Sequence, residues 1–146
     1  QPLLGHHFSS QARPMFTTQK FCSFVAALSL TVFAALSAHA APPSVQLEDA
    51  RTALEKSSMV VIDIRESSET ASGVAKGAKL IPMSQISKRL SELPAPGKEP
   101  FLLVCNTQNR SAKVAEQLAA AGYTNVSFVQ GGMSQWTARG WPLVKP

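Results

Sequence analysis

The stretch "FLLVCNTQNRSAKVAEQLAAAGY", residues 101–123, joins an apolar run to a polar turn and then to a helix-like segment. Its first five residues are all apolar, which is typical of a strand buried on both faces of a parallel sheet. In the last part, Val114 and Leu118 fall on one helical face, and Gly122 is placed to end the helix. The stretch therefore predicts a strand, a short loop and a helix, which is one β-α unit.

Similar units fill most of the chain after residue 40. Further strands are expected in three short runs rich in β-branched residues, at residues 59–65, 79–81 and 126–129. Further helices are expected at residues 45–58, at residues 84–93 with Ser84 as the cap, and within residues 131–140. Strands that alternate with helices in this way predict an α/β fold of three layers, a mostly parallel sheet with helices on both faces.

Residues 15–40 have the three parts of a secretory signal peptide. Lys20 provides a short positive start, an apolar middle follows, and Ala38-His39-Ala40 forms a small-x-small end. An uncleaved membrane anchor is the alternative, but a span needs about 20 apolar residues and this run includes several Ser and Thr. We expect cleavage after Ala40, a periplasmic or secreted protein, and no stable membrane span after cleavage. Residues 1–14 are expected to be an upstream segment outside the mature protein.

The mature part, residues 41–146, has the length of one domain with a core of its own. Of the 14 Lys and Arg residues, Arg13 and Lys20 precede it, which leaves 12 against 9 acidic residues. This excess is small and scattered, so nucleic-acid binding is not expected. Cys105 is the only thiol of this part and cannot form an internal disulfide, so it is either an inert core residue or a reactive one.

The position of Cys105 favours the reactive alternative. Ligands of parallel α/β sheets bind beyond the carboxyl ends of the strands, and Cys105 is the predicted last residue of such a strand. The turn of residues 106–109 can aim backbone N–H groups inward, and the helix that begins near Arg110 and Ser111 adds the positive end of its dipole. Such surroundings favour the thiolate, which is a nucleophile.

Two features limit the chemistry of this thiol. The last histidine is His39, so a Cys-His or Ser-His hydrolase is excluded for the mature part, and we expect neither a metal nor a cofactor. Cys105 and Arg110 are separated by four residues, one fewer than in the Cys-x5-Arg loop of the cysteine-dependent phosphatases. A smaller ring of amides fits an additional sulfur atom better than a phosphate, so a phosphatase or an arsenate reductase is disfavoured.

Four segments together resemble the single-domain rhodaneses, a family of sulfurtransferases. They are "VIDIRESSET" with Asp63 and Arg65 and a Glu close behind, at Glu66 or Glu69; "GVAKGAKLIP" with Gly73, Gly77, Ala78, Ile81 and Pro82; the loop and helix after Cys105; and "VQGGMSQWTARGWP" with Gly131, Gly132, Trp136, Gly140 and Pro142. They occur in the order of the family and cover nearly all of residues 46–143. We expect Asp63 and Arg65 to form a structural pair.

The resemblance implies a rhodanese-like five-stranded sheet and a sulfurtransferase reaction. Cys105 would take a sulfane sulfur from a small anionic donor such as thiosulfate and pass it, from a persulfide, to a thiol or to cyanide; a redox partner protein is a further possible partner. The substrate-binding residues implied are Asn106, Thr107, Gln108, Asn109, Arg110 and Ser111.

Gln108 departs from the family. Family loops often carry Gly there, and where the backbone needs a positive φ, Gln adopts it at a steric cost. A rhodanese-like carrier or protein-interaction module without efficient turnover is therefore the alternative function.

Overall fold

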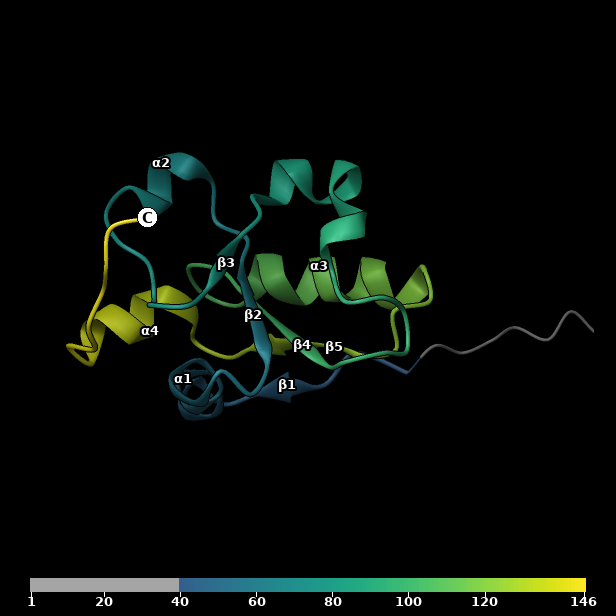
Figure 1. Ribbon diagram of the computed structural model, residues 1–146, viewed down its shortest axis with the longest axis horizontal. Coiled ribbons are helices and arrows are strands. Elements are labelled where there is room, and N and C mark those ends of the chain that lie inside the picture. Colours follow the sequence, from purple (N-terminus) through teal and green to yellow (C-terminus); the bar gives the residue numbers. More distant parts are fainter. Residues whose placement is uncertain (1–39) are drawn as a thin grey trace, which may run out of the picture. The chain divides into compact units, whose positions relative to one another are not determined.

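The structure is a computed structural model that describes residues 40–146 (Figure 1). The predicted upstream segment and all of the predicted signal peptide except Ala40 lie outside the described residues. Within residues 40–146, no helix has both the length and the apolar character needed to cross a membrane.

The centre of the fold is a five-stranded sheet in which every pair of neighbouring strands is parallel, in the order β1-β5-β4-β2-β3. In chain order the strands are β1 (Ser44–Val45), β2 (Val60–Asp63), β3 (Lys79–Leu80), β4 (Phe101–Val104) and β5 (Val126–Val129). The predicted parallel α/β sheet of five strands is thus confirmed. The central strand β4 lies between β5 and β2, which places the residues that follow it at the middle of the sheet edge.

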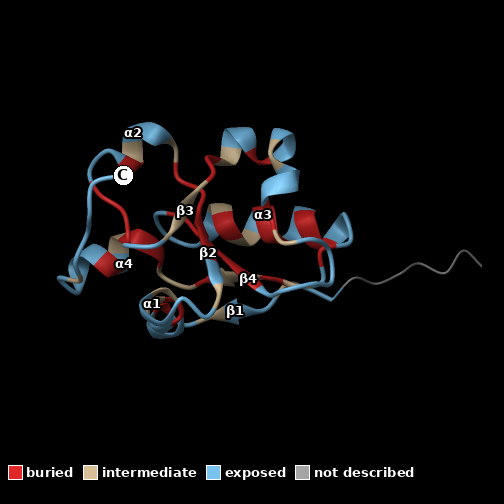
Figure 2. Cartoon of the chain, in the orientation of Figure 1, coloured by how far each residue is buried: buried red, intermediate tan, exposed pale blue. Residues whose placement is uncertain are grey.

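Helices cover both faces of this sheet, as predicted (Figure 1). They are α1 (Leu47–Lys56), α2 (Ser67–Thr70), α3 (Asn109–Ala120) and α4 (Gly132–Ala138), with the 3-10 segments η1 (Met83–Lys88) and η2 (Leu90–Glu92). Side chains of β4 alternate between the faces: Leu103 belongs to the core under α3 and η1, and Val104 to the core under α1 and α4. Both cores are visible as the buried inner surfaces of the elements in Figure 2.

Some predicted elements differ from the structure. Residues 84–93 form two 3-10 segments instead of an α-helix, with i to i+3 bonds such as that from the Arg89 N–H to the Ile86 carbonyl. Ser84 does not cap this segment, because its N–H and hydroxyl both bond to the carboxylate of Glu66. Val45, predicted as helical, instead pairs with Val129 in the sheet.

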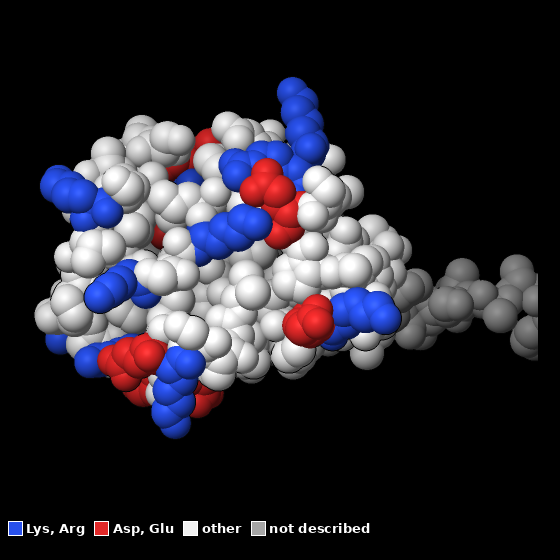
Figure 3. Space-filling model, viewed as in Figure 1, with Lys and Arg blue, Asp and Glu red and all other residues white. Residues whose placement is uncertain are grey.

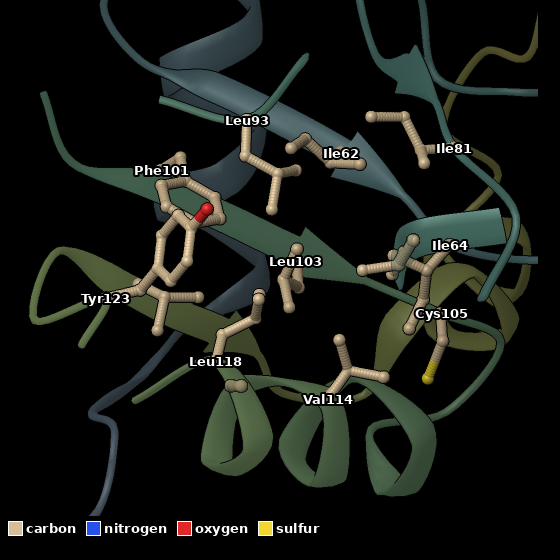
Figure 4. Close-up of a cluster of buried hydrophobic side chains, with 13 residues drawn as sticks. Ile62, Ile64, Ile81, Leu93, Phe101, Leu103, Cys105, Val114, Leu118 and Tyr123 are labelled. Atoms are coloured by element: carbon tan, nitrogen blue, oxygen red, sulfur yellow. The ribbon is translucent and has the colours of Figure 1, made fainter. Parts of the chain in front are cut away.

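Cys105 belongs to the core on the α3 face of the sheet. It is part of one cluster of buried side chains with Ile64 and Val114 (Figure 4). The strand itself ends at Val104, one residue earlier than predicted, so Cys105 is the first residue of the loop. Its side chain still follows the alternation of β4 and points to the same face as Leu103.

Candidate active site

The thiol of Cys105 is completely buried, with an exposed fraction of 0%. In Figure 4 its sulfur points toward the end of α3 nearest the loop. The sequence predicted the strand-end position but not this degree of burial, which results from the packing of Cys105 with Ile64 and Val114. A donor can therefore reach the sulfur only when the loop or its neighbours move.

The loop after Cys105 is held by the N-terminus of α4. The N–H of Met133 donates to the carbonyl of Cys105, and the N–H of Ser134 donates to the carbonyl of Asn106, both at 2.8 Å. Gly132 makes this approach possible: it has φ +56°, and a Cβ atom on it would lie 2.0 Å from the carbonyl oxygen of Thr107. A tight turn at Gly131 and Gly132 thus lies against the loop that follows Cys105.

These contacts fix the direction of the loop amides. In a trans peptide the N–H points opposite to the preceding C=O. Because the carbonyls of Cys105 and Asn106 face α4, the N–H groups of Asn106 and Thr107 point away from α4, toward the face that carries the Cys105 side chain. Within the described chain, the N–H groups of residues 106–110 donate to no protein acceptor, so they are free to bind an anion.

Ser111 is the polar side chain in contact with the thiol. Its hydroxyl oxygen lies 3.4 Å from Cys105 Sγ and donates to the carbonyl of Gln108 at 3.1 Å. The thiol can donate its proton to the Ser111 oxygen, and a thiolate could instead accept the hydroxyl proton. Ser111 was predicted as a substrate-binding residue; it is fully buried and touches the Cys105 sulfur.

Gln108 has a negative φ of −148°, with ψ −12°. The positive φ considered for this position is absent, and with it the steric cost. Positive φ values occur instead at Gly131 and Gly132, in the turn against which the loop packs. The side chain of Gln108 supports that contact, because its Oε1 accepts the N–H of Gly131 at 3.0 Å.

Arg110 forms a bidentate ion pair with Glu69. Its two terminal nitrogens lie 2.8 and 2.6 Å from the two carboxylate oxygens, and both side chains are about one third exposed. The hydrogen bonds from Arg110 lower the pKa of Glu69 to about 2. The same contact raises the pKa of the Arg110 guanidinium, with smaller electrostatic contributions from Cys105 and Glu66. Both terminal nitrogens of Arg110 are therefore already bound to a carboxylate.

A second, buried ion pair fixes the chain beneath this contact. Asp63 is fully buried. Its carboxylate accepts hydrogen bonds from the backbone N–H and the guanidinium of Arg65, at 2.7 to 3.0 Å. Arg65 also donates to the carbonyl of Gly73 at 3.0 Å. Since each charge is matched and hydrogen-bonded, the pair is stable despite its burial. The predicted structural role of this pair is confirmed in its geometry.

The structure brings together the thiol, the loop amides, Arg110 and Ser111 at one end of β4. The side chains of Asn106, Thr107 and Asn109 are exposed, so the structure shows no contact from them to the sulfur. Sequence reasoning missed the pairing of Glu69 with Arg110, which lie 41 positions apart. It named Glu69 only as one of two acidic residues behind Arg65. Among residues 40–146, no group of His, Cys, Asp and Glu side chains could hold a metal ion.

Comparisons with known proteins agree with this geometry. The sequence pattern of the rhodanese-like domain matches residues 46–139. A sulfurtransferase of Allochromatium vinosum is 32% identical over 88 residues, covering 60% of this chain and 80% of the relative. The thiosulfate sulfurtransferase GlpE of Pseudomonas putida is 32% identical over 93 residues, covering 62% and 81%. The chain spans only about half the length of some other curated relatives.

A solved structure gives the same result at the level of the fold. The rhodanese-like domain protein of Staphylococcus aureus has a TM-score of 0.60 and 33% identity, and the match covers 70% of this chain and 99% of that one. The matched pattern covers well over half of the chain and includes the cysteine loop and both sides of the sheet. On these grounds the chain belongs to the rhodanese-like family and is related to sulfurtransferases.

Proposed function

We propose that this protein is an exported sulfurtransferase that carries sulfur on Cys105. The observation that supports it most directly is the pair of hydrogen bonds from the N-terminus of α4 to the loop carbonyls. These bonds orient free loop N–H groups toward the face of the sheet that carries the Cys105 side chain. A persulfide anion on Cys105 would receive hydrogen bonds from these N–H groups and from the hydroxyl of Ser111.

The reaction has two displacement steps. The thiolate of Cys105 attacks the outer sulfur of a donor such as thiosulfate, the S–S bond of the donor breaks, and sulfite leaves with the bonding electrons. A thiolate or cyanide then attacks the outer sulfur of the Cys105 persulfide, and the Cys105 thiolate leaves. Atoms and charge balance in both steps, and no cofactor takes part.

Intact mass spectrometry under non-reducing conditions tests this proposal. Incubation of residues 41–146 with thiosulfate is expected to add the mass of one sulfur atom, and Cys105→Ser is expected to abolish the addition. If the wild-type protein gains no sulfur from any donor, the proposal is wrong. Arg110→Ala is expected to weaken thiosulfate use more than it lowers the melting temperature; equal losses would argue against a role in donor binding.

A sulfur carrier without efficient turnover is the second candidate, and the complete burial of Cys105 favours it. The negative φ of Gln108 removes the other reason for preferring it, the expected need for a positive φ at this position. The two candidates differ in one measurement: a carrier would gain sulfur but release it to cyanide or a small thiol much more slowly than it gains it.

Export remains part of the proposal and agrees with the burial of Cys105. A lone thiol in an oxidising compartment is at risk of over-oxidation, and burial protects it. On the face shown in Figure 3, basic and acidic side chains are interspersed, so this face lacks the basic surface that nucleic-acid binding needs. Cell fractionation of the native producer, with detection of the 41–146 product outside the cytoplasm, tests this part.

A further inference from the structure

Arg110 provides the one positive side chain among residues 106–110, the active loop, and it is bound by Glu69. Residues 106–109 are Asn, Thr, Gln and Asn, so they add no charge. Both terminal nitrogens of Arg110 bond to Glu69, and the carboxylate of Glu69 is itself held by the N–H of Glu66 at 3.0 Å. The carboxylate is therefore fixed in place before any donor arrives.

We propose that Glu69 determines the charge preference of the donor site: its carboxylate competes with the donor for Arg110 and selects against doubly charged donors such as thiosulfate. This inference rests on the proposed sulfurtransferase function. A donor anion that is to bind the terminal nitrogens of Arg110 has to displace Glu69 from them. Such a donor binds only the fraction of molecules in which the ion pair is open, so its apparent affinity falls in proportion to that fraction.

A second carboxylate strengthens this effect. Glu66 is held through its two oxygens by the N–H and the hydroxyl of Ser84, at 3.0 and 2.9 Å. It lies close enough to Arg110 to contribute to the guanidinium's raised pKa, after the larger contribution of Glu69. The nearby Asp63 and Arg65 cancel each other. These five side chains thus carry a net negative charge, although the reaction needs an anion to approach.

The charge of the donor then decides how strongly it is disfavoured. Attack of the Cys105 thiolate on thiosulfate brings a singly charged and a doubly charged anion together, beside two carboxylates. A persulfide of the form R–S–SH reacts with the same thiolate to give the Cys105 persulfide and R–S⁻, with balanced atoms and electrons and with less charge at the reacting sulfur. Repulsion between like charges rises with the product of the charges, so Glu69 penalises thiosulfate more than a persulfide.

The opposite role for Glu69 is also physically possible, because a carboxylate that grips Arg110 could orient it for the donor. The two roles predict opposite results when the carboxylate is removed. If Glu69 competes, its removal strengthens thiosulfate binding; if it orients Arg110, its removal weakens it.

The test is single-turnover loading of the full mature protein, followed by intact mass spectrometry over a range of donor concentrations. Thiosulfate is compared with cysteine persulfide, whose ammonium and carboxylate charges cancel. The variants are Glu69→Gln, which keeps the shape of the side chain and its acceptor for the Glu66 N–H, and Glu66→Gln. The latter removes an equal charge from a side chain that contacts Ser84 instead of Arg110.

Glu69→Gln is expected to lower the half-saturating thiosulfate concentration about tenfold, as the open fraction of Arg110 approaches one, with the limiting rate changed less than about twofold. The half-saturating concentration of cysteine persulfide should change much less. Glu66→Gln should lower the thiosulfate value as well, but by less than Glu69→Gln does, because Glu66 does not contact Arg110. A higher half-saturating concentration for thiosulfate in Glu69→Gln, or equal changes for the two donors, overturns the proposal.

If Glu69→Gln does not fold, Glu69→Asp serves instead. It keeps the charge but is one methylene shorter, so it cannot reach both nitrogens in the present geometry, and it is expected to shift the thiosulfate value in the same direction. Failure of the underlying function looks different from failure of this inference: in that case no variant gains sulfur from either donor.

Discussion

The hydroxyl oxygen of Ser111 lies 3.4 Å from the sulfur of Cys105, and both side chains are completely buried. No other side-chain oxygen or nitrogen of the described chain forms a hydrogen bond with this sulfur. To donate to a thiolate or persulfide, the Ser111 hydroxyl has to turn its one proton from the Gln108 carbonyl to the sulfur, and Ser111→Ala removes this donor. A hydrogen bond to a charged group contributes about 1.5–3 kcal/mol and the bond given up about 0.5–1.5 kcal/mol, so we expect sulfur loading to slow about tenfold.

The control for this variant is Ser134→Ala. Ser134 also bonds a backbone carbonyl through its hydroxyl, that of Gly131 at 3.1 Å, but it does not touch Cys105. Both variants are expected to lose a similar, small amount of stability in urea denaturation. Only Ser111→Ala should slow loading, and equal rates in the two variants would show that the Ser111 hydroxyl does not act on the sulfur.

Gly132→Ala is expected to disrupt the loop. An added Cβ would lie 2.0 Å from the carbonyl oxygen of Thr107 and 2.5 Å from that of Cys105, so the loop or α4 must move. Overpacking costs about 1–3 kcal/mol, and the positive φ adds about 1 kcal/mol. We therefore expect urea denaturation to show a loss of about 2–4 kcal/mol, together with a large loss of sulfur loading.

Gly140→Ala separates the two causes. Gly140 has a similar φ of +66°, but an added Cβ would meet no atom within 4 Å. Gly140→Ala is expected to lower the free energy of unfolding by only about 1 kcal/mol, the cost of a positive φ for Ala, and to leave sulfur loading unchanged. If Gly132→Ala is no more damaging than Gly140→Ala, the close approach of α4 to the loop is not what holds the loop in place.

The burial of Cys105 predicts slow, size-dependent alkylation. Reaction at a fully buried thiol requires local opening, and each 1.4 kcal/mol of opening free energy slows it about tenfold relative to the unfolded chain. For each reagent, the rate constant with the native protein is divided by the rate constant in denaturant. This ratio is expected to be smaller for a bulky maleimide than for iodoacetamide, because the larger reagent needs a wider opening. Ratios near one for both reagents would mean that the sulfur is open to solvent.

The sequence predicted the elements that have a pattern long enough to read. The strands β2, β4 and β5 are apolar and partly β-branched, and α3 has a clear apolar face, so all four were found within a few residues. The two-residue β1 and the four-residue α2 were missed because neither is long enough to show a period. Residues 84–93 were wrongly predicted as an α-helix because Ile86 and Leu93 are both buried, as they would be on one face of an α-helix.

The site was predictable only where it is local in sequence. Cys105, the loop and Arg110 follow one another along the chain, so their proximity could be inferred. The partners of the loop come from elsewhere: Glu69 from α2, and Gly132 from the start of α4. For the same reason the sequence did not show the conformation of Gln108. Its φ is negative, and positive φ values occur instead at Gly131 and Gly132, against which the loop packs.

The ion pair of Glu69 and Arg110 predicts a stability change in acid. The pair lowers the pKa of Glu69 from its ordinary value near 4.5 to about 2. The Glu69 carboxylate is therefore protonated at a lower pH in the folded protein than in the unfolded chain. The stabilisation is fully present above about pH 4.5 and is lost as the pH falls from there toward 2. Wild type is thus expected to exceed Glu69→Gln in free energy of unfolding at pH 6, and the difference should shrink steadily between pH 4.5 and 2.

Urea denaturation at a series of pH values measures this difference, with Glu55→Gln as the matched control. Glu55 pairs with Arg51 on the surface of α1 and is 59% exposed, so solvent screens the pair and its loss should matter little at any pH. A difference between wild type and Glu69→Gln that stays constant from pH 6 to 2 would contradict the prediction. It would mean that the difference does not come from the charge of Glu69, so that the ion pair with Arg110 contributes little to the free energy of unfolding.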